Sequence, residues 1–201
     1  HIKKNGEHFI LKTNHSDYKA KKIVLATGGS ASKNLGSDGS GFKLAKELGH
    51  KIIKPLPALV QLKTDDSNFK IIAGVRSQAY IELYIDDKLA STEIGELQFT
   101  KYGVSGIPVF QISRYASKAL DKSQKVSLKI DLLYDLDWKA TMDLLEKRII
   151  INPYKNIEEI FYGLFNNKLI LYILKRTGIF SKLEAKKISK GQLVSLVNII
   201  K

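Results

Sequence analysis

The stretch that most constrains the fold runs from Ile23 to Gly29 and reads IVLATGG. A short apolar run ends here in a small residue, a hydroxyl residue and two glycines, and a helical pattern begins further on, near Gly41. A buried strand that leads into a glycine turn is how α/β proteins bring their backbone close to a nucleotide. Because other strands of α/β proteins also end in glycine pairs, this run alone indicates an α/β domain without specifying a ligand.

Two longer segments carry a more specific signal. They read IVLATGGSASKNLGSDGSGFKLAKELGHKIIKPLPALVQLK at 23–63 and GELQFTKYGVSGIPVFQISR at 95–114. In this order the segments resemble the bacterial NAD(FAD)-utilising dehydrogenases, which are also described as aminoacetone-oxidase-type FAD-binding flavoproteins. The resemblance implies an FAD-dependent oxidoreductase that transfers hydride through its flavin. It also implies a β-rich domain, inserted into the FAD-binding domain, that covers the flavin and shapes the substrate pocket.

Flavoproteins of this type open with a strand–GxGxxG–helix unit whose helix N-terminus holds the FAD pyrophosphate. This chain opens at His1 without that motif, and the family's C-terminal glycine-rich segment is not visible up to Lys201. The expectation is an internal fragment whose partners are the missing N- and C-terminal parts of the same flavoprotein and a small-molecule substrate. FAD would then belong to the intact protein and would not be retained by this chain alone. NAD(P)H is the candidate co-substrate.

Composition limits the class of protein further. The chain has 201 residues, of which 44% are hydrophobic, so it can bury a core as one large domain or two small ones. No apolar run reaches the roughly 18 residues of a membrane span. The absence of cysteine excludes disulfides, iron–sulfur ligation and thiolate catalysis. We expect a cytoplasmic protein with no membrane partner.

The formal net charge of +13 raises the question of an anionic partner, because clustered lysines and arginines bind phosphate in nucleic-acid-binding proteins. The lysines are spread along the chain. In the densest cluster, Lys182, Lys186 and Lys190 would share one face of a helix, with Lys187 beside them. We interpret this cluster as a solvated helix face. The alternatives to the oxidoreductase are a non-catalytic binding or scaffold module and, with less support, a basic nucleic-acid-binding domain.

The order of strand-like and helix-like segments divides the chain into three parts. Residues 1–54 are interpreted as a partial FAD-binding domain with the ATGG turn, 55–133 as an inserted β-barrel-like domain, and 134–201 as its helical part. The expected fold class is α+β: a fragment of an α/β FAD-binding domain carrying an inserted β-barrel-like domain followed by a helical subdomain. Strands are predicted at 7–13, 18–26, 79–85, 97–100 and 126–130, and helices at 38–48, 108–120, 138–149, 157–165, 168–177 and 189–200.

The turn formed by Ala26, Thr27, Gly28 and Gly29 is the first candidate site. In the resembling family it lies near the FAD. The absence of side chains at the glycines would let backbone N–H groups approach the dinucleotide. The alternative is an ordinary turn from a strand into a loop.

The loop from Gly36 to Gly41 is the second candidate, with Gly39 and Gly41 as its cofactor-binding residues. It resembles the family's Gly-Ser-Thr-Gly-Asp-Gly stretch, in which backbone donors at a helix start would suit a flavin edge or an anionic substrate group. This chain departs from the pattern with Asp38 and Ser40, so a role for the family's carboxylate at position 40 is open. The alternative is helix capping by Asp38 or Ser40.

The segment from Thr100 to Pro108 is the third candidate. Gly103 and Gly106 indicate a tight backbone, and Ser105 is a candidate cap for the helix that follows. The segment is either a wall of the substrate or flavin pocket or a structural turn that seats the helix on the barrel. No residue has the pattern of a general acid or base, so the catalytic residues stay unassigned. The four histidines have no metal-ligand spacing and are expected on the surface.

Overall fold

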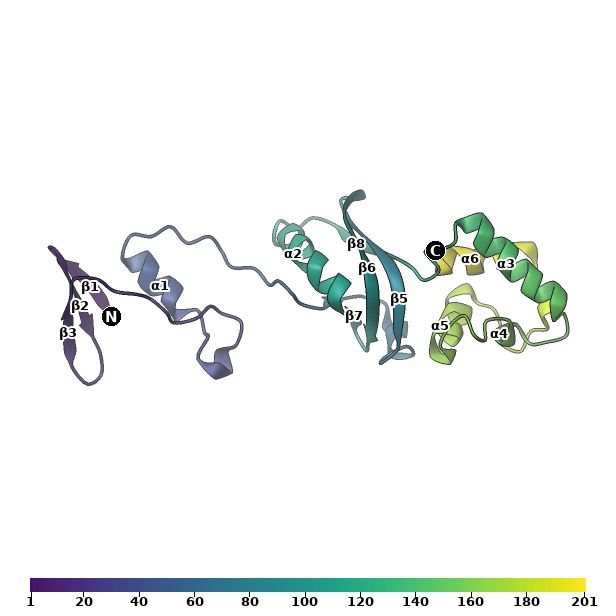
Figure 1. Cartoon of the computed structure of the whole chain (residues 1–201), viewed down its shortest axis with the longest axis horizontal. Coiled ribbons are helices and arrows are strands. Elements are labelled where there is room, and N and C mark those ends of the chain that lie inside the picture. The colour runs from purple at the N-terminus through teal and green to yellow at the C-terminus, as the bar shows by residue number, and fades with distance from the viewer. The chain divides into compact units, whose positions relative to one another are not determined.

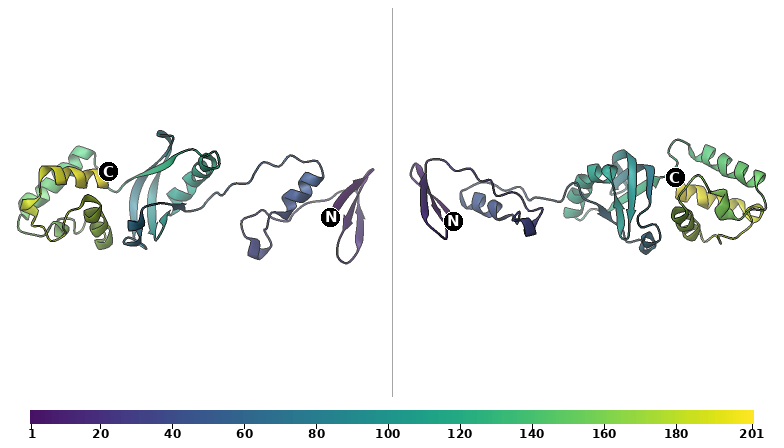
Figure 2. Two further views of the ribbon diagram at one scale, coloured as in Figure 1. Left: turned by 180° about the vertical axis from the view of Figure 1, so that it is seen from behind. Right: turned by 60° about the horizontal axis from the view of Figure 1, so that its bottom comes forward.

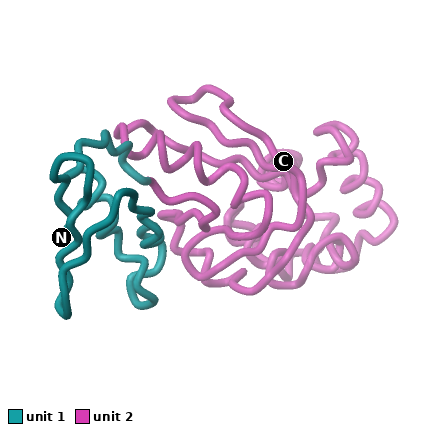
Figure 3. The backbone as a smooth tube through the Cα atoms, turned by 60° about the vertical axis from the view of Figure 1, so that its left-hand side comes forward, with its two compact units in different colours: residues 1–55 teal, residues 56–201 magenta.

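The computed structural model describes all residues from 1 to 201, and they form two compact units (Figure 3). Unit 1 contains residues 1–55 and unit 2 contains residues 56–201. None of the helices in either unit is both long and apolar enough to cross a membrane.

Unit 1 begins with a three-stranded antiparallel sheet in the order β1-β2-β3. The predicted strand at 18–26 is wrong in its second half, because the observed strand ends at Ala20. The apolar run from Ile23 to Ala26 joins no sheet, and Val24 is 88% exposed. A strand is held by hydrogen bonds to a neighbouring strand, and these residues have none within the chain. The strands are β1 (Ile2–Asn5), β2 (His8–Lys12) and β3 (Asp17–Ala20).

The helix predicted at 38–48 is confirmed as α1 (Ser40–Glu47), which follows the short 3-10 helix η1 (Lys33–Leu35). Its N-cap is Gly39, so the prediction of Asp38 or Ser40 as N-cap is wrong by one residue. Asp38 instead accepts a hydrogen bond from the backbone N–H of Ser40. Gly49 ends the helix as expected, with a φ of 92° that few other residues adopt.

Unit 2 begins with a five-stranded antiparallel sheet in the order β4-β7-β6-β5-β8, curled into a half-barrel. The helix α2 (Ile107–Asp121) packs against one face of this sheet (Figures 1 and 2). Because β4 and β8 are not paired with each other, the sheet has two edges and does not close. The strands are β4 (Leu62–Lys63), β5 (Arg76–Ile85), β6 (Lys88–Thr100), β7 (Gly103–Ser105) and β8 (Val126–Asp131).

Alternation along β5 explains which face of the sheet is buried. Ala79, Ile81 and Leu83 are completely buried, whereas the residues between them are only partly buried. This period of two is what a strand with one core-facing side requires. Val109 and Ile112 of α2 are also completely buried in the same core.

The rest of unit 2 is helical. Asp137 caps α3, because its carboxylate accepts a hydrogen bond from the backbone N–H of Ala140. The helix predicted at 157–165 is wrong in length, because α4 ends after one turn and Gly163 takes a positive φ of 81°. The helices are α3 (Trp138–Ile151), α4 (Ile157–Ile160), α5 (Asn167–Thr177) and α6 (Lys190–Ile200), with 3-10 turns η2 (Ser67–Lys70) and η3 (Ala185–Lys187).

One continuous core joins the half-barrel to these helices. The ring of Phe69 in η2 lies 5.9 Å from Phe99 of β6 and 5.8 Å from Tyr172 of α5, edge to face in both cases. At the end of β8, Lys201 pairs with Asp131 at 2.6 Å. Unit 2 is therefore a mixed α and β structure in which the helical part and the half-barrel share their apolar interior.

Candidate functional site

The two glycine-rich loops named from the sequence meet in unit 1. The backbone N–H of Gly39 donates a hydrogen bond of 2.9 Å to the carbonyl of Gly29. Gly41, at the start of α1, is buried beside Thr27. The structure thus brings the turn at 26–29 next to Gly39 and Gly41, although ten or more residues separate them in the sequence.

Packing between the loops accounts for two of the glycines. A Cβ atom at Gly41 would lie 1.9 Å from the hydroxyl oxygen of Thr27, and one at Gly28 would lie 2.8 Å from the hydroxyl oxygen of Ser37. Gly28 also has a φ of 74°, which L side chains rarely adopt. At both positions a side chain of the same chain would have to move to make room for a Cβ atom, and at Gly28 the positive φ adds a backbone requirement for glycine.

Gly29 differs from these glycines. Its φ is not positive, and a Cβ atom built on it would meet no atom within 4 Å. Neither backbone conformation nor packing inside unit 1 requires a glycine at this position. Gly29, with the exposed Ala26 nearby in the turn, therefore leaves its backbone open to the approach of another group.

The N-terminus of α1 is less open to an anion than expected from the sequence. The carboxylate of Asp38 accepts the N–H of Ser40 at 2.9 Å and so occupies one of the free donors. That backbone hydrogen bond, together with the hydroxyl of Ser40 and the charge of Lys33, holds the pKa of Asp38 below its usual range. An anionic group at this helix start would meet a carboxylate that is ionised at neutral pH.

The tight backbone predicted at Gly103 and Gly106 is confirmed, which supports the interpretation of the segment 100–108 as a structural turn. A Cβ atom at Gly103 would lie 1.9 Å from the carbonyl oxygen of Leu62, and one at Gly106 would lie 2.4 Å from that of Glu96. The expected cap at Ser105 is wrong, because Ser105 ends β7 and Gly106 occupies the N-cap position of α2. The two glycines let the chain pass close to neighbouring strands before it enters the helix.

Two further expectations concern charged and metal-binding side chains. The prediction that Lys182, Lys186 and Lys190 share one helix face is wrong, because Lys186 belongs to η3 and Lys190 is the first residue of α6. Lys182 is paired with Glu158, and Lys186 with Glu184. Three of the four histidines are exposed and His8 is partly buried. No three His, Cys, Asp or Glu side chains are grouped so that they could hold a metal ion.

A polar cluster that the sequence did not indicate lies in unit 2. Asp66 accepts hydrogen bonds from the backbone and side chain of Asn68, from the hydroxyl of Tyr172 at 2.9 Å and from Arg176 at 2.8 Å. Burial raises the pKa of Asp66, but these hydrogen bonds and the charge of Arg176 outweigh it, so the net pKa lies below the usual range. Burial and the bond to Asp66 raise the pKa of Tyr172 to about 12.

We expect Asp66→Asn to lower the free energy of unfolding by about 1 kcal/mol at pH 7, since it removes a charge-assisted network that is partly exposed at Arg176. A carboxyl whose folded pKa is depressed stabilises the fold above its unfolded pKa of about 4, and this contribution is lost as the pH falls further. The difference from the unmodified chain should therefore shrink below about pH 4. Urea unfolding at several pH values measures it, and a difference that stays constant down to pH 3 would contradict the assignment.

Unit 2 defines a class of protein domain: an antiparallel half-barrel with one helix against its sheet, continued into a helical part that shares its core. The chain belongs to the HI0933-like family, because residues 56–201 match the family model described as "HI0933-like protein barrel and H2TH domain". This match confirms the predicted combination of a barrel-like part and a helical part. Residues 1–55 lie outside the matched range.

Three curated proteins are similar to the chain. The 3-dehydro-bile acid delta(4,6)-reductase of Clostridium scindens is 34% identical over 200 residues, which are 100% of this chain and 49% of that protein. The ribosomal RNA dihydrouridine synthase of Haemophilus influenzae is 25% identical over 194 residues, covering 96% of this chain and 45% of that protein. The enzyme of the same name from Escherichia coli is 28% identical over 117 residues. The chain spans about half the length of the first two relatives.

Proposed function

We propose that this chain is part of a flavin-dependent oxidoreductase in which residues 1–55 contribute to the FAD site. The observation that carries the proposal is the 34% identity to a reductase along the whole chain, glycine loops included. The open backbone at Gly29 supports it, since that is where a dinucleotide can approach without displacing a side chain. Bound FAD would supply hydride transfer, while this chain would position substrate and exclude water.

The reaction class that we propose is reduction of a carbon–carbon double bond. The relatives' names describe a reductase and synthases of dihydrouridine, and dihydrouridine is uridine with hydrogen added across its ring double bond. NADH or NADPH would supply the electrons. Unit 2 would cover the flavin and shape the substrate pocket. The partners would be a small-molecule substrate and the remaining parts of the same flavoprotein, including the apolar strand neighbours that Ile23 to Ala26 lack within this chain.

Flavin content after purification tests this proposal. We would measure absorbance, and fluorescence of heat-released cofactor, for the 201-residue chain and for the same chain extended at both ends with its natural flanking sequence. We expect flavin in the extended protein only. Flavin in both would show that the glycine loops bind FAD without a GxGxxG unit. Flavin in neither would favour the non-catalytic binding or scaffold module.

A second candidate is that the substrate is RNA. It is favoured by the net charge of +13 together with the names of the two ribosomal RNA dihydrouridine synthases. Binding of a labelled single-stranded RNA should then weaken steeply between about 50 and 200 mM salt, because each phosphate contact releases counterions. Binding that is absent, or that does not change with salt, would remove this candidate.

A further inference from the structure

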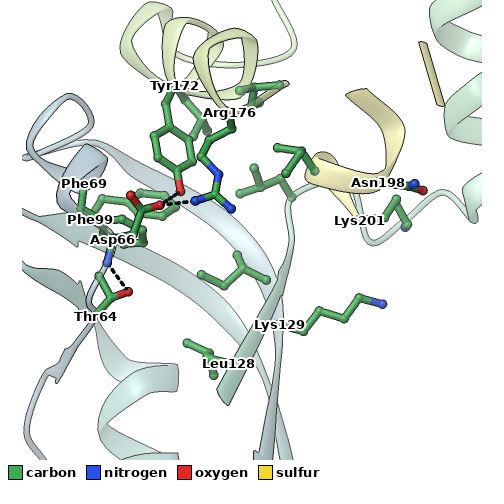
Figure 4. A pocket seen from close by; sticks show the side chains of 15 residues that line it. Thr64, Asp66, Phe69, Phe99, Leu128, Lys129, Tyr172, Arg176, Asn198 and Lys201 are labelled. Carbon is green, nitrogen blue, oxygen red and sulfur yellow. Dashed lines mark hydrogen bonds and ion pairs between the residues drawn. The ribbon is translucent and has the colours of Figure 1, made fainter. Parts of the chain in front are cut away.

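A cavity of about 380 Å³ lies at the open seam of the half-barrel (Figure 4). Its walls come from both unpaired edges of the sheet, with Thr64 next to β4 and Leu128 on β8. Ile173 of α5 and Ile199 of α6 close the side where a barrel would have continued. This volume is in the range of small-molecule sites, which often occupy barrel mouths and boundaries between subdomains.

The cavity is lined by apolar and polar side chains, and the polar ones gather on two sides, with Lys129, Asn198 and Lys201 across from Asp66 and Arg176. Leu128, Ile130, Leu132 and Ile199, which are partly buried, contribute hydrocarbon surface, whereas Phe69, Phe99 and Ile173 are almost completely buried in the core. Figure 4 shows Asp66, Tyr172 and Arg176 meeting at one end, while Asn198 lies on the opposite side. A molecule that fills this space can place an apolar body against the aliphatic side chains and a polar group at one side.

Among Asp66, Tyr172 and Arg176, Arg176 is the group that can take another partner. Both carboxylate oxygens of Asp66 already accept two hydrogen bonds each, so that residue is satisfied. Arg176 reaches Asp66 through Nη1 alone and makes no other hydrogen bond, and its side chain is 42% exposed. The guanidinium group has five N–H donors in a planar fork that matches a carboxylate. Its remaining donors point toward the space between α5 and the sheet (Figure 4).

We propose that this cavity binds a small apolar molecule that carries a carboxylate. The hydrocarbon part lies among Leu128, Ile130 and Ile199, and the carboxylate accepts hydrogen bonds from Arg176. An inorganic anion fits less well, since it would leave the apolar walls uncovered. The site lies wholly within unit 2 and needs no cofactor. The proposal that this cavity binds a carboxylate and the proposal that residues 1–55 contribute to an FAD site can therefore be tested independently.

The chain supplies its own reporter for a test. Trp138 is the single tryptophan, and its Nε1–H donates a hydrogen bond of 2.7 Å to Oδ1 of Asn198, which lines the cavity. We would titrate the 201-residue chain with decanoate below its micelle-forming concentration and follow Trp138 emission, with calorimetry as a second measurement. Decanol is the matched probe, because it has the same chain length and no charge. Decanoate should saturate and should bind about ten-fold more tightly than decanol.

Two variants locate the site. Leu128→Phe should fill the space and abolish binding of both probes. Arg176→Gln should reduce decanoate binding about ten-fold to the level of decanol while leaving decanol unchanged, which a merely unfolding variant would not do. Arg76→Gln is the matched control, since Arg76 pairs with Glu96 at 2.8 Å and does not line the cavity. Circular dichroism establishes that each variant is folded.

Three results would overturn the proposal. The first is no saturable decanoate binding to the folded chain by either measurement. The second is equal affinity for decanoate and decanol, which would indicate hydrophobic association without recognition of the carboxylate. The third is an equal loss in Arg76→Gln and Arg176→Gln, which would indicate a general effect of positive charge. If Leu128→Phe does not fold, Ile199→Phe takes its place, since Ile199 also lines the cavity and is only partly buried, and retained binding in a folded filling variant also counts against the cavity.

Discussion

Gly103→Ala should lower the free energy of unfolding of unit 2 by about 3 kcal/mol, an effect at the upper end of single substitutions. The added Cβ would lie 1.9 Å from the carbonyl oxygen of Leu62 and 2.9 Å from the Cα of Lys63. These are backbone atoms of β4, the strand that pairs with β7, so no rotation of a side chain relieves the contact. The two strands must separate at this edge, and urea unfolding followed by circular dichroism measures the loss.

Gly191→Ala is the matched control for this substitution. Gly191 lies in the first turn of α6, and a Cβ atom there meets nothing within 4 Å. The control should leave stability unchanged or raise it by up to about 1 kcal/mol, because alanine is the better helix former. If Gly103→Ala unfolds at the same urea concentration as the control, β4 and β7 are not packed as described.

Gly29→Leu should abolish flavin retention in the chain extended at both ends, with at least about a ten-fold fall in bound flavin after gel filtration. A Cβ atom at Gly29 meets no atom of unit 1 within 4 Å, so the loops should keep their packing while the leucine side chain fills the space where the dinucleotide would approach. The measurement is the ratio of flavin absorbance to protein absorbance.

Gly191→Leu is the control for this second experiment, since it adds the same side chain at another open glycine without a positive φ. Gly28→Val is a poor alternative test, because its side chain would collide with Ser37 and disturb the loop itself. Full flavin content in folded Gly29→Leu would show that the turn does not contact the cofactor.

Local sequence patterns, such as capping residues and alternating polarity, predicted the helices well and the strands less well. The helices α2, α3 and α6 begin within about one residue of the predicted positions, because Pro108, Asp137 and Ser189 mark their starts in the sequence. β6 extends over Lys88–Thr100, although only its last four residues were predicted. Its first half is mixed in polarity, and it is a strand because β5 pairs along it. Ile23 to Ala26 is the reverse case, a strand-like sequence without a partner.

Sequence motifs also predicted one candidate site and missed the other. Short motifs identified Gly28, Gly29 and Gly41, but only the structure separates the two that pack against Ser37 or Thr27 from the one that is open. The sequence contained no local pattern that indicated the cluster of Asp66, Tyr172 and Arg176. Asp66 lies 106 residues from Tyr172 and 110 residues from Arg176 in the sequence. Contacts over such separations depend on the fold, which single-sequence periodicity does not reveal.

The unclosed sheet also has a consequence for association between molecules. An exposed strand edge can accept a strand from another chain and so start aggregation. Here β4 is only two residues long, and the exposed Lys129 lies in the middle of β8. A short edge on one side and a charge on the other both oppose the addition of a foreign strand. The half-barrel can therefore keep its seam open to a small molecule while its edges resist growth into a larger sheet.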